Sequence, residues 1–124
     1  MRPEPSTEIE LYFLIDSRSP ERYRGEQETV DPVAGHIPNA VNRYYRDNLT
    51  EDGLFLPKAD LHKAYETLIG EIPPDHVVVY CGSGVTACHH LLAMEIAGLF
   101  GAKLYAGSWS EWIRDPNRPT TTGE

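Results

Sequence analysis

The sequence has few cysteines and no long apolar run. Its 124 residues include only two cysteines, Cys81 and Cys88, and these form no CxxC pair. Two cysteines do not make the framework of a disulfide-rich secreted domain, so we expect a reducing cytoplasmic location. The longest apolar run near the N-terminus, residues 11–15, is too short for a membrane span or for the core of a signal peptide.

Basic residues are also scarce, with 11 Lys and Arg against 19 Asp and Glu and a formal net charge of −8. This balance disfavours binding to nucleic acid or to an anionic membrane surface. An anionic substrate therefore needs a local basic cluster or inward-facing backbone N–H groups. The length and the 40% apolar content predict one domain over residues 1–124, with a core at about 9–114, a loose lead-in and a loose C-terminal tail.

Short apolar runs alternate with helical patterns along the chain. Residues 11–15 and 77–80 are predicted strands, and residues 40–42 and 103–106 are weaker candidates. A first helix is predicted from Asp60 as N-cap to Gly70 as its stop. A second helix is predicted from Val85 to near Gly98, and its expected buried stripe is Val85, Cys88, Leu92, Ile96 and Leu99. This alternation indicates an α/β domain with a mainly parallel sheet.

The segment 80–87, Tyr-Cys-Gly-Ser-Gly-Val-Thr-Ala, joins a predicted strand to a predicted helix. In open α/β sheets, ligands bind where strand carboxyl ends meet helix N-termini. Gly82 and Gly84 allow a loop whose backbone N–H groups turn inward and cradle an anion, and the helix dipole favours a thiolate there. Cys81 is therefore the candidate nucleophile; the alternative is a buried structural cysteine.

A cysteine phosphatase would place an arginine six positions after its nucleophile to grip phosphate. This chain has Ala87 there, and no Arg or Lys lies between Cys81 and Lys103. The sequence therefore disfavours phosphoryl transfer.

The segment 81–86 resembles the active-site loop of rhodanese-type sulfurtransferases, in the form typical of 3-mercaptopyruvate sulfurtransferases. Four other segments match that family in order and approximate spacing: Asp-Ser-Arg at 16–18, Arg-Tyr-Arg-Gly at 22–25, Gly-His-Ile-Pro-Asn-Ala-Val-Asn at 35–42 and Gly-Ser-Trp-Ser-Glu-Trp at 107–112. The resemblance covers about residues 11–116. It implies a rhodanese-like α/β fold with a mainly parallel central sheet and helices on both faces.

The resemblance implies a sulfurtransferase that needs no metal or organic cofactor. Cys81 would take sulfur from 3-mercaptopyruvate or thiosulfate, hold it as a persulfide, and pass it to cyanide or to a thiol of a small molecule or a thioredoxin-like protein. It also implies that Arg22 binds the donor's carboxylate or sulfonate. The remaining implied substrate-binding residues are Gly82, Ser83, Gly84, Val85 and Thr86.

Arg18 and Arg24 extend the positive cluster around Arg22. The alternative interpretation is that these arginines are solvated and paired with Glu21 and Glu26, and for Arg24 we favour that alternative.

Two features bear on the donor. Gly82 and Ser83 stand where thiosulfate-specific relatives have basic side chains, which favours a monoanionic 2-keto thiol over dianionic thiosulfate. Residues 26–34 lack a second arginine that mercaptopyruvate enzymes usually carry. Carboxylate binding is therefore expected to be weaker, or to be completed by Arg43 or Arg46.

Several residues near the motif are given structural interpretations. Cys88 is expected in the core, with His89 and His90 on the helix surface, so a metal cluster is disfavoured. Cys88 as a resolving thiol is kept as a minority hypothesis. His36 is assigned to loop packing, and Trp109 and Trp112 to the core or its rim.

Enzymes with this loop usually have two tandem rhodanese-like domains, of which the C-terminal one carries the cysteine, and this chain resembles that half. About ten residues precede the first predicted strand, fewer than is usual. We therefore expect an open cleft, with weak activity or a need for self-association such as a homodimer. The alternative function is a sulfur-carrier module that receives a persulfide from a partner protein without turning over a small donor.

Overall fold

Four short parallel strands form one sheet in the order β2-β1-β3-β4 in the computed structural model, which describes residues 12–82 and 86–123. Strand β1 (Phe13–Asp16) pairs along its whole length with β3 (Val77–Tyr80). The outer strands β2 (Val41–Asn42) and β4 (Lys103–Leu104) are two residues long, and both pairings are parallel. The predicted parallel α/β sheet is confirmed, although β4 ends two residues earlier than expected. The lead-in and residue 11 lie outside the described residues.

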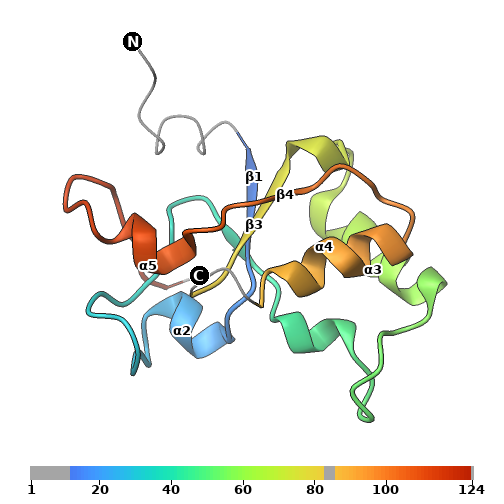
Figure 1. Ribbon diagram of the computed structural model, residues 1–124, viewed down its shortest axis with the longest axis horizontal. Helices are drawn as coiled ribbons and strands as arrows, with labels where there is room; N and C mark the ends of the chain where they lie inside the picture. The colour runs from blue at the N-terminus through green and yellow to red at the C-terminus, as the bar shows by residue number, and fades with distance from the viewer. Residues whose placement is uncertain (1–11, 83–85, 124) are drawn as a thin grey trace.

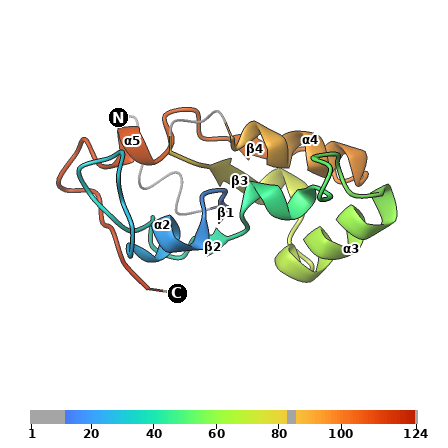
Figure 2. The ribbon, with the colours of Figure 1, turned by 90° about the horizontal axis from the view of Figure 1, so that it is seen from below.

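Two pairs of helices cover the two faces of the sheet (Figures 1 and 2). Helices α2 (Pro20–Arg24) and α5 (Ser108–Trp112) pack on one face, and α3 (Lys58–Ile69) and α4 (Cys88–Ile96) pack on the other. Single turns of 3-10 helix, η1 (Tyr45–Asn48) and η2 (Pro74–His76), lie in the connections. Side chains alternate along a strand, so Val77 and Val79 join the α3/α4 core while Val78 and Tyr80 join the α2/α5 core.

Helix α3 begins three residues earlier than its predicted first turn. Pro57 occupies the N-cap position without a side-chain hydrogen bond, and Asp60 lies in the first turn. The prediction of Asp60 as N-cap is therefore wrong, although its negative charge still favours that end of the helix. Gly70, with a φ of 60°, is the C-cap as predicted.

The buried face of α4 agrees with the predicted stripe only in part: Ile96 and Leu99 are partly buried and pack against the core. Cys88 and Leu92 are exposed, and Val85 lies outside the described residues. The residues that are buried on and beside this helix are Ala87, His90, Ala93, Met94 and Ala97. The inner face of α4 thus combines small alanines with two larger side chains, His90 and Met94.

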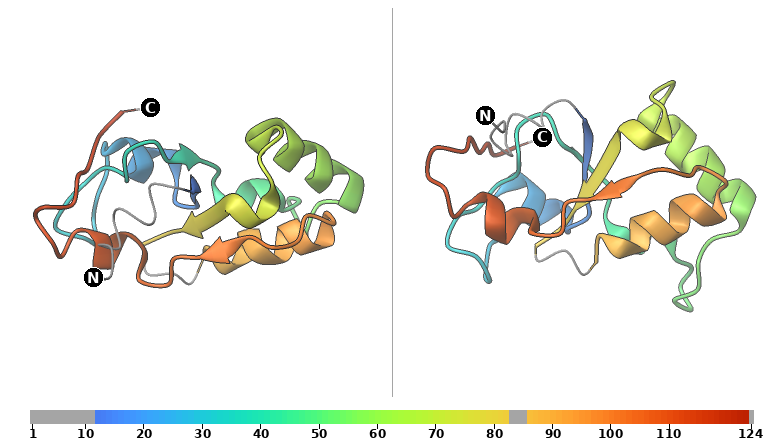
Figure 3. Two further views of the ribbon diagram at one scale, coloured as in Figure 1. Left: turned by 90° about the horizontal axis from the view of Figure 1, so that it is seen from above. Right: turned by 45° about the horizontal axis from the view of Figure 1, so that its top comes forward.

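The C-terminal tail, expected to be loose, is bound beside α2 (Figure 3). Thr121 and His36 exchange both backbone hydrogen bonds in an antiparallel bridge, and the N–H of Gly123 donates to the carbonyl of Arg24. The indole N–H of Trp112 donates to the carbonyl of Pro119 at 2.8 Å. Residues 119–123 are therefore part of the folded unit.

His36 and the two tryptophans take the packing roles predicted for them. The ring of His36 stacks on that of Tyr23 with centroids 3.8 Å apart, and its Nδ1 lies 2.7 Å from the carbonyl of Tyr23. Trp109 and Trp112 are fully buried in the α2/α5 core.

Candidate active site

Cys81 follows directly after β3 and is almost completely buried. Its backbone N–H donates to Ser108 Oγ at 3.0 Å, and its carbonyl accepts the N–H of Trp109 at 2.9 Å. The carbonyl of Gly82 accepts the N–H of Ser110 at 2.9 Å. The first turn of α5 thus fixes the backbone on both sides of the thiol, which keeps the reactive atom at a defined position.

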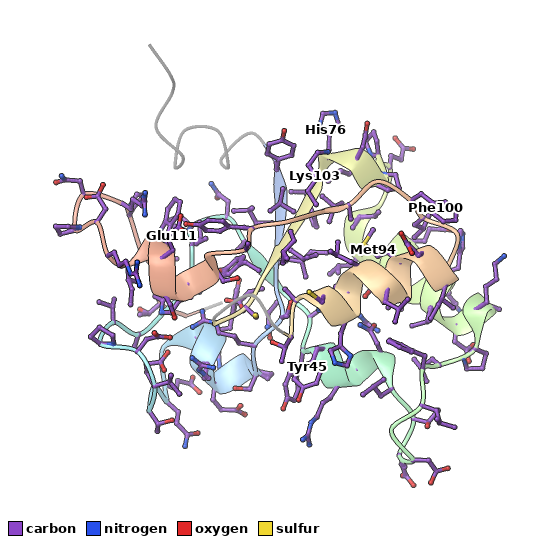
Figure 4. The ribbon with its side chains drawn as sticks, in the orientation of Figure 1. Tyr45, His76, Met94, Phe100, Lys103 and Glu111 are labelled. Carbon is purple, nitrogen blue, oxygen red and sulfur yellow. The ribbon has the colours of Figure 1, made fainter. Side chains whose placement is uncertain are left out.

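A hollow of about 170 Å³ lies over Cys81. Three parts of the chain form its wall: α2 with the loop that follows it, the loop after β3, and α5, which carries the labelled Glu111 in Figure 4. The lining residues are Arg22, Val30, Asp31, Cys81, Gly82, Thr86 and Ser110. The structure therefore brings together four of the predicted site residues, Cys81, Arg22, Gly82 and Thr86. The other three, Ser83, Gly84 and Val85, lie outside the described residues.

The guanidinium of Arg22 lies directly against the backbone of Gly82. A Cβ atom built on Gly82 would be 3.3 Å from Arg22 Nη2 and 3.5 Å from Nη1. The absence of a side chain at position 82 thus lets the cation approach the loop that begins at Cys81. The Arg22 side chain keeps a quarter of its surface exposed, so an anion in the hollow can reach it.

Two carboxylates also bind Arg22. Its Nη2 donates to Glu28 Oε2 at 3.2 Å and to Asp31 Oδ2 at 3.3 Å. The expected alternative partners, Glu21 and Glu26, are not the residues that bind it. Glu28 and Asp31 are not part of the predicted site; the signal for them is the presence of acidic residues within residues 26–34, close in sequence to Arg22.

Hydrogen bonds to neighbouring groups hold the carboxylates of Glu28 and Asp31 in place. Glu28 Oε2 accepts the backbone N–H groups of Val30 and Asp31 at 3.0 and 3.1 Å. Burial alone would raise the pKa of Glu28, but these backbone bonds and the charge of Arg22 lower it below its ordinary value. Asp31 Oδ1 accepts a hydrogen bond from Ser110 Oγ at 2.8 Å, which ties the loop to α5.

Arg18 and Arg24 do not belong to the anion site, which corrects the predicted three-arginine cluster. Arg18 is 3% exposed, binds Asp16 Oδ2 at 2.7 Å, and lies 4.8 Å from the ring centroid of Trp109. Burial lowers the pKa of Arg18, but the hydrogen bond and charge of Asp16 raise it above its ordinary value. Arg24 pairs with Glu26 at 3.0 Å on the surface, as favoured from the sequence.

Arg43 and Arg46, the candidates to complete carboxylate binding, do not line the hollow. Arg43 Nε donates to Asn48 Oδ1 at 2.9 Å, and Arg46 Nε donates to the hydroxyl of Tyr45 at 3.3 Å. Tyr45, labelled in Figure 4, lies beside α4, with its ring 5.0 Å from that of His89. Both arginines therefore bind residues of η1 and do not contribute to the hollow over Cys81.

The expectations for Cys88 and His90 are reversed. Cys88 is exposed, and His90 is completely buried. Its Nδ1 lies 2.6 Å from the hydroxyl of Tyr65, and its Nε2 lies 2.8 Å from the carbonyl of Arg43. Burial lowers the pKa of His90 to about 4, because the charged form would lose its hydration. Residues 12–82 and 86–123 contain no group of three or more His, Cys, Asp or Glu placed to hold a metal ion.

Comparison with known proteins assigns the family. The model of the family described as "Rhodanese-like domain" matches residues 4–115. A probable 3-mercaptopyruvate sulfurtransferase of Pseudomonas aeruginosa is 55% identical over 111 residues, which are 90% of this chain and 39% of that protein. The human 3-mercaptopyruvate sulfurtransferase is 39% identical over 108 residues, 85% of this chain and 36% of its own length. The chain thus spans less than two fifths of each of these relatives.

Solved structures agree with this assignment. The anaerobic ergothioneine biosynthesis enzyme from Chlorobium limicola, in complex with trimethyl histidine, superimposes with a TM-score of 0.81 at 25% identity. The match covers 96% of this chain and 31% of that one. None of the helices within the described part of the chain is long and apolar enough to cross a membrane. Because the family model, the sequence relatives and the fold all agree, this chain belongs to the rhodanese-like family.

Proposed function

We propose that this domain is a sulfurtransferase that carries sulfur on Cys81 and takes it from 3-mercaptopyruvate or thiosulfate. The observation that carries the proposal is the presence of Cys81 and Arg22 in one hollow of about 170 Å³ at the carboxyl end of β3. The names of the sequence relatives support the reaction class.

In the first step the Cys81 thiolate forms an Sγ–S bond with the sulfur to be transferred, which is the outer sulfur of thiosulfate or the thiol sulfur of 3-mercaptopyruvate. With thiosulfate, a new Sγ–S bond forms, the S–S bond of the donor breaks, and its electron pair leaves with sulfite. With 3-mercaptopyruvate, the C–S bond breaks, and the thiol proton ends on the carbon of the departing pyruvate. Either donor leaves an anionic persulfide on Cys81, and Arg22 binds the donor's carboxylate or sulfonate during the attack.

In the second step the acceptor attacks the outer sulfur of the persulfide. Cyanide leaves as thiocyanate, and a thiolate leaves as its own persulfide; in both cases the Sγ–S bond breaks and its electron pair returns to the Cys81 thiolate. The proposed biological acceptor is a small thiol or a thioredoxin-like protein in a reducing cytoplasm. The residues that we propose to stabilise both anions are Gly82, Ser83, Gly84, Val85 and Thr86, through their N–H groups and the hydroxyl of Ser83.

The test is a turnover assay of the whole chain with each donor and with cyanide as acceptor, measuring thiocyanate and, for 3-mercaptopyruvate, pyruvate. Wild type and Cys88→Ser should turn over at least one donor, and Cys81→Ser should turn over neither. If wild type turns over neither donor but accepts sulfur from a persulfidated protein, the domain is a carrier module and the proposed activity is wrong.

A further inference from the structure

The charged side chains beside Cys81 bear on which sulfur donors the site accepts, and the residues of the 81–86 loop do not include them. Two guanidinium groups and two carboxylates meet here, and Arg22 binds both Glu28 and Asp31. The buried Arg18 lies 3.5 Å from Glu28, so Asp31 is the carboxylate paired with Arg22 alone. The Glu28 and Asp31 side chains are 5% and 9% exposed, so both carboxylates are held within the structure and not free in solvent. The lowered pKa of Glu28 keeps its carboxyl ionised at neutral pH.

The hydrogen bonds of Arg22 are distributed unevenly over its guanidinium. Both carboxylates bind Nη2. The Nε–H of Arg22 is buried and has no acceptor among the described residues. An anion that binds the exposed quarter of the Arg22 side chain therefore shares one guanidinium with two carboxylates that already bind it.

Asp31 is the carboxylate that a donor meets more directly, because it lines the hollow while Glu28 does not. Its Oδ1 is fixed by Ser110 at 2.8 Å, and its Oδ2 is 3.3 Å from Arg22 Nη2. The carboxylate is therefore held in place and cannot swing away when an anion enters.

We infer that Asp31 is a specificity-determining residue that disfavours dianionic donors and favours monoanionic ones. This inference rests on the proposed function and names the substrate class of the same site. Each negative charge on the donor is repelled by the Asp31 carboxylate, so thiosulfate is penalised about twice as strongly as 3-mercaptopyruvate. The repulsion acts together with the lack of basic side chains at Gly82 and Ser83.

The test compares wild type with Asp31→Asn, which keeps an oxygen able to accept from Ser110 and removes one charge. We expect kcat/KM to rise about tenfold for thiosulfate and about threefold for 3-mercaptopyruvate, a change proportional to donor charge. The matched control is Glu26→Gln, which removes a carboxylate of the same loop that pairs with Arg24 outside the hollow. The donor ratio, which is kcat/KM for thiosulfate divided by kcat/KM for 3-mercaptopyruvate, should be the same in Glu26→Gln as in wild type.

Salt dependence supplies a second measurement that a purely structural role would not affect. Added KCl should raise the ratio of thiosulfate to 3-mercaptopyruvate activity in wild type and change it less in Asp31→Asn, because salt screens the repulsion. An unchanged donor ratio in Asp31→Asn, or equal salt dependence in both proteins, overturns the inference.

A binding experiment distinguishes failure of this inference from failure of the proposed function. Calorimetry with Cys81→Ser and Cys81→Ser/Asp31→Asn measures affinity for thiosulfate and for pyruvate without chemistry. If wild type shows no turnover but Asp31→Asn still strengthens thiosulfate binding more than pyruvate binding, the proposed function fails and the charge selection holds. If wild type turns over a donor but Asp31→Asn changes neither the ratio of kcat/KM values nor the ratio of affinities, the inference about Asp31 is wrong and the proposed function stands.

Discussion

Two buried polar groups on opposite faces of the sheet, the His90 ring and the Arg22 Nε–H, differ in whether they have hydrogen-bond partners within residues 12–82 and 86–123. On the α3/α4 face, both ring nitrogens of His90 have partners, the hydroxyl of Tyr65 and the carbonyl of Arg43. On the α2/α5 side, Arg22 keeps a buried Nε–H without an acceptor among the described residues, beside the hollow over Cys81. A satisfied network contributes stability, whereas a cation that lines a hollow with a quarter of its side chain exposed is available to a ligand. Substitutions on the first face should therefore alter stability, and those at the hollow should alter activity.

The largest effect is expected from Arg22→Ala. The substitution removes the anion-binding cation and leaves Glu28 and Asp31 to repel the donor, so kcat/KM should fall on the order of 10³-fold. The free energy of unfolding should fall by only about 1 kcal/mol, because both carboxylates keep their other hydrogen bonds. Steady-state kinetics and urea unfolding measure the two quantities. Arg24→Ala is the control, and an equal loss of activity there would contradict the assignment.

Acidification should destabilise the fold through His90. Its pKa is about 4 in the fold and 6.5 ordinarily, so between these values the unfolded chain binds a proton that the folded chain does not. The associated stability, about 3 kcal/mol, is fully present above pH 6.5 and is lost as the pH falls toward 4.

Urea unfolding of wild type and His90→Gln across this range measures the effect. The variant should show a much shallower slope; a residual slope of the same sign is expected from His36, whose pKa burial also lowers. Equal slopes in the two proteins would contradict the role given to His90.

Ser108→Ala should affect both properties. The buried N–H of Cys81 loses its acceptor, which costs about 2 kcal/mol of stability. Displacement of the thiol should lower kcat about tenfold, since small misplacements of a nucleophile are costly. Thermal unfolding and donor turnover test this. Retention of full kcat would show that the α5 contact does not position Cys81.

The smallest effect is expected from Gly82→Ala. The new methyl group would lie 3.3 Å from Arg22 Nη2, so the guanidinium must move by a few tenths of an ångström. KM for either donor should rise about threefold with little change in stability, because one end of a partly exposed side chain can adjust. A rise of KM for one donor alone would indicate a direct contact with that donor instead.

The sequence predicts most of the fold and the central pair of the site. The two central strands follow from short apolar runs, the two outer strands lie within the weaker candidate segments, and Cys81 and Arg22 lie in local motifs that can be read directly. Asp31 and Ser110 could not be predicted, because their contact joins positions 79 residues apart and exists only after folding.

Which face of α4 is buried also could not be predicted from the sequence. Apolar spacing selected Cys88 and Leu92 for the buried face, but His90 is buried instead. Its burial depends on Tyr65 and Asn48, which come from α3 and η1. A helix pattern read alone does not contain the partners that make a buried histidine acceptable.

The most direct test of the account is the intact mass of the chain after a single exposure to each donor without an acceptor. Wild type should gain about 32 Da, the mass of one sulfur atom, and peptide mapping should place it on Cys81. The gain should disappear in Cys81→Ser, persist in Cys88→Ser, and reverse on addition of cyanide. Sulfur found on Cys88, or no gain in wild type with either donor, would contradict the central role of Cys81.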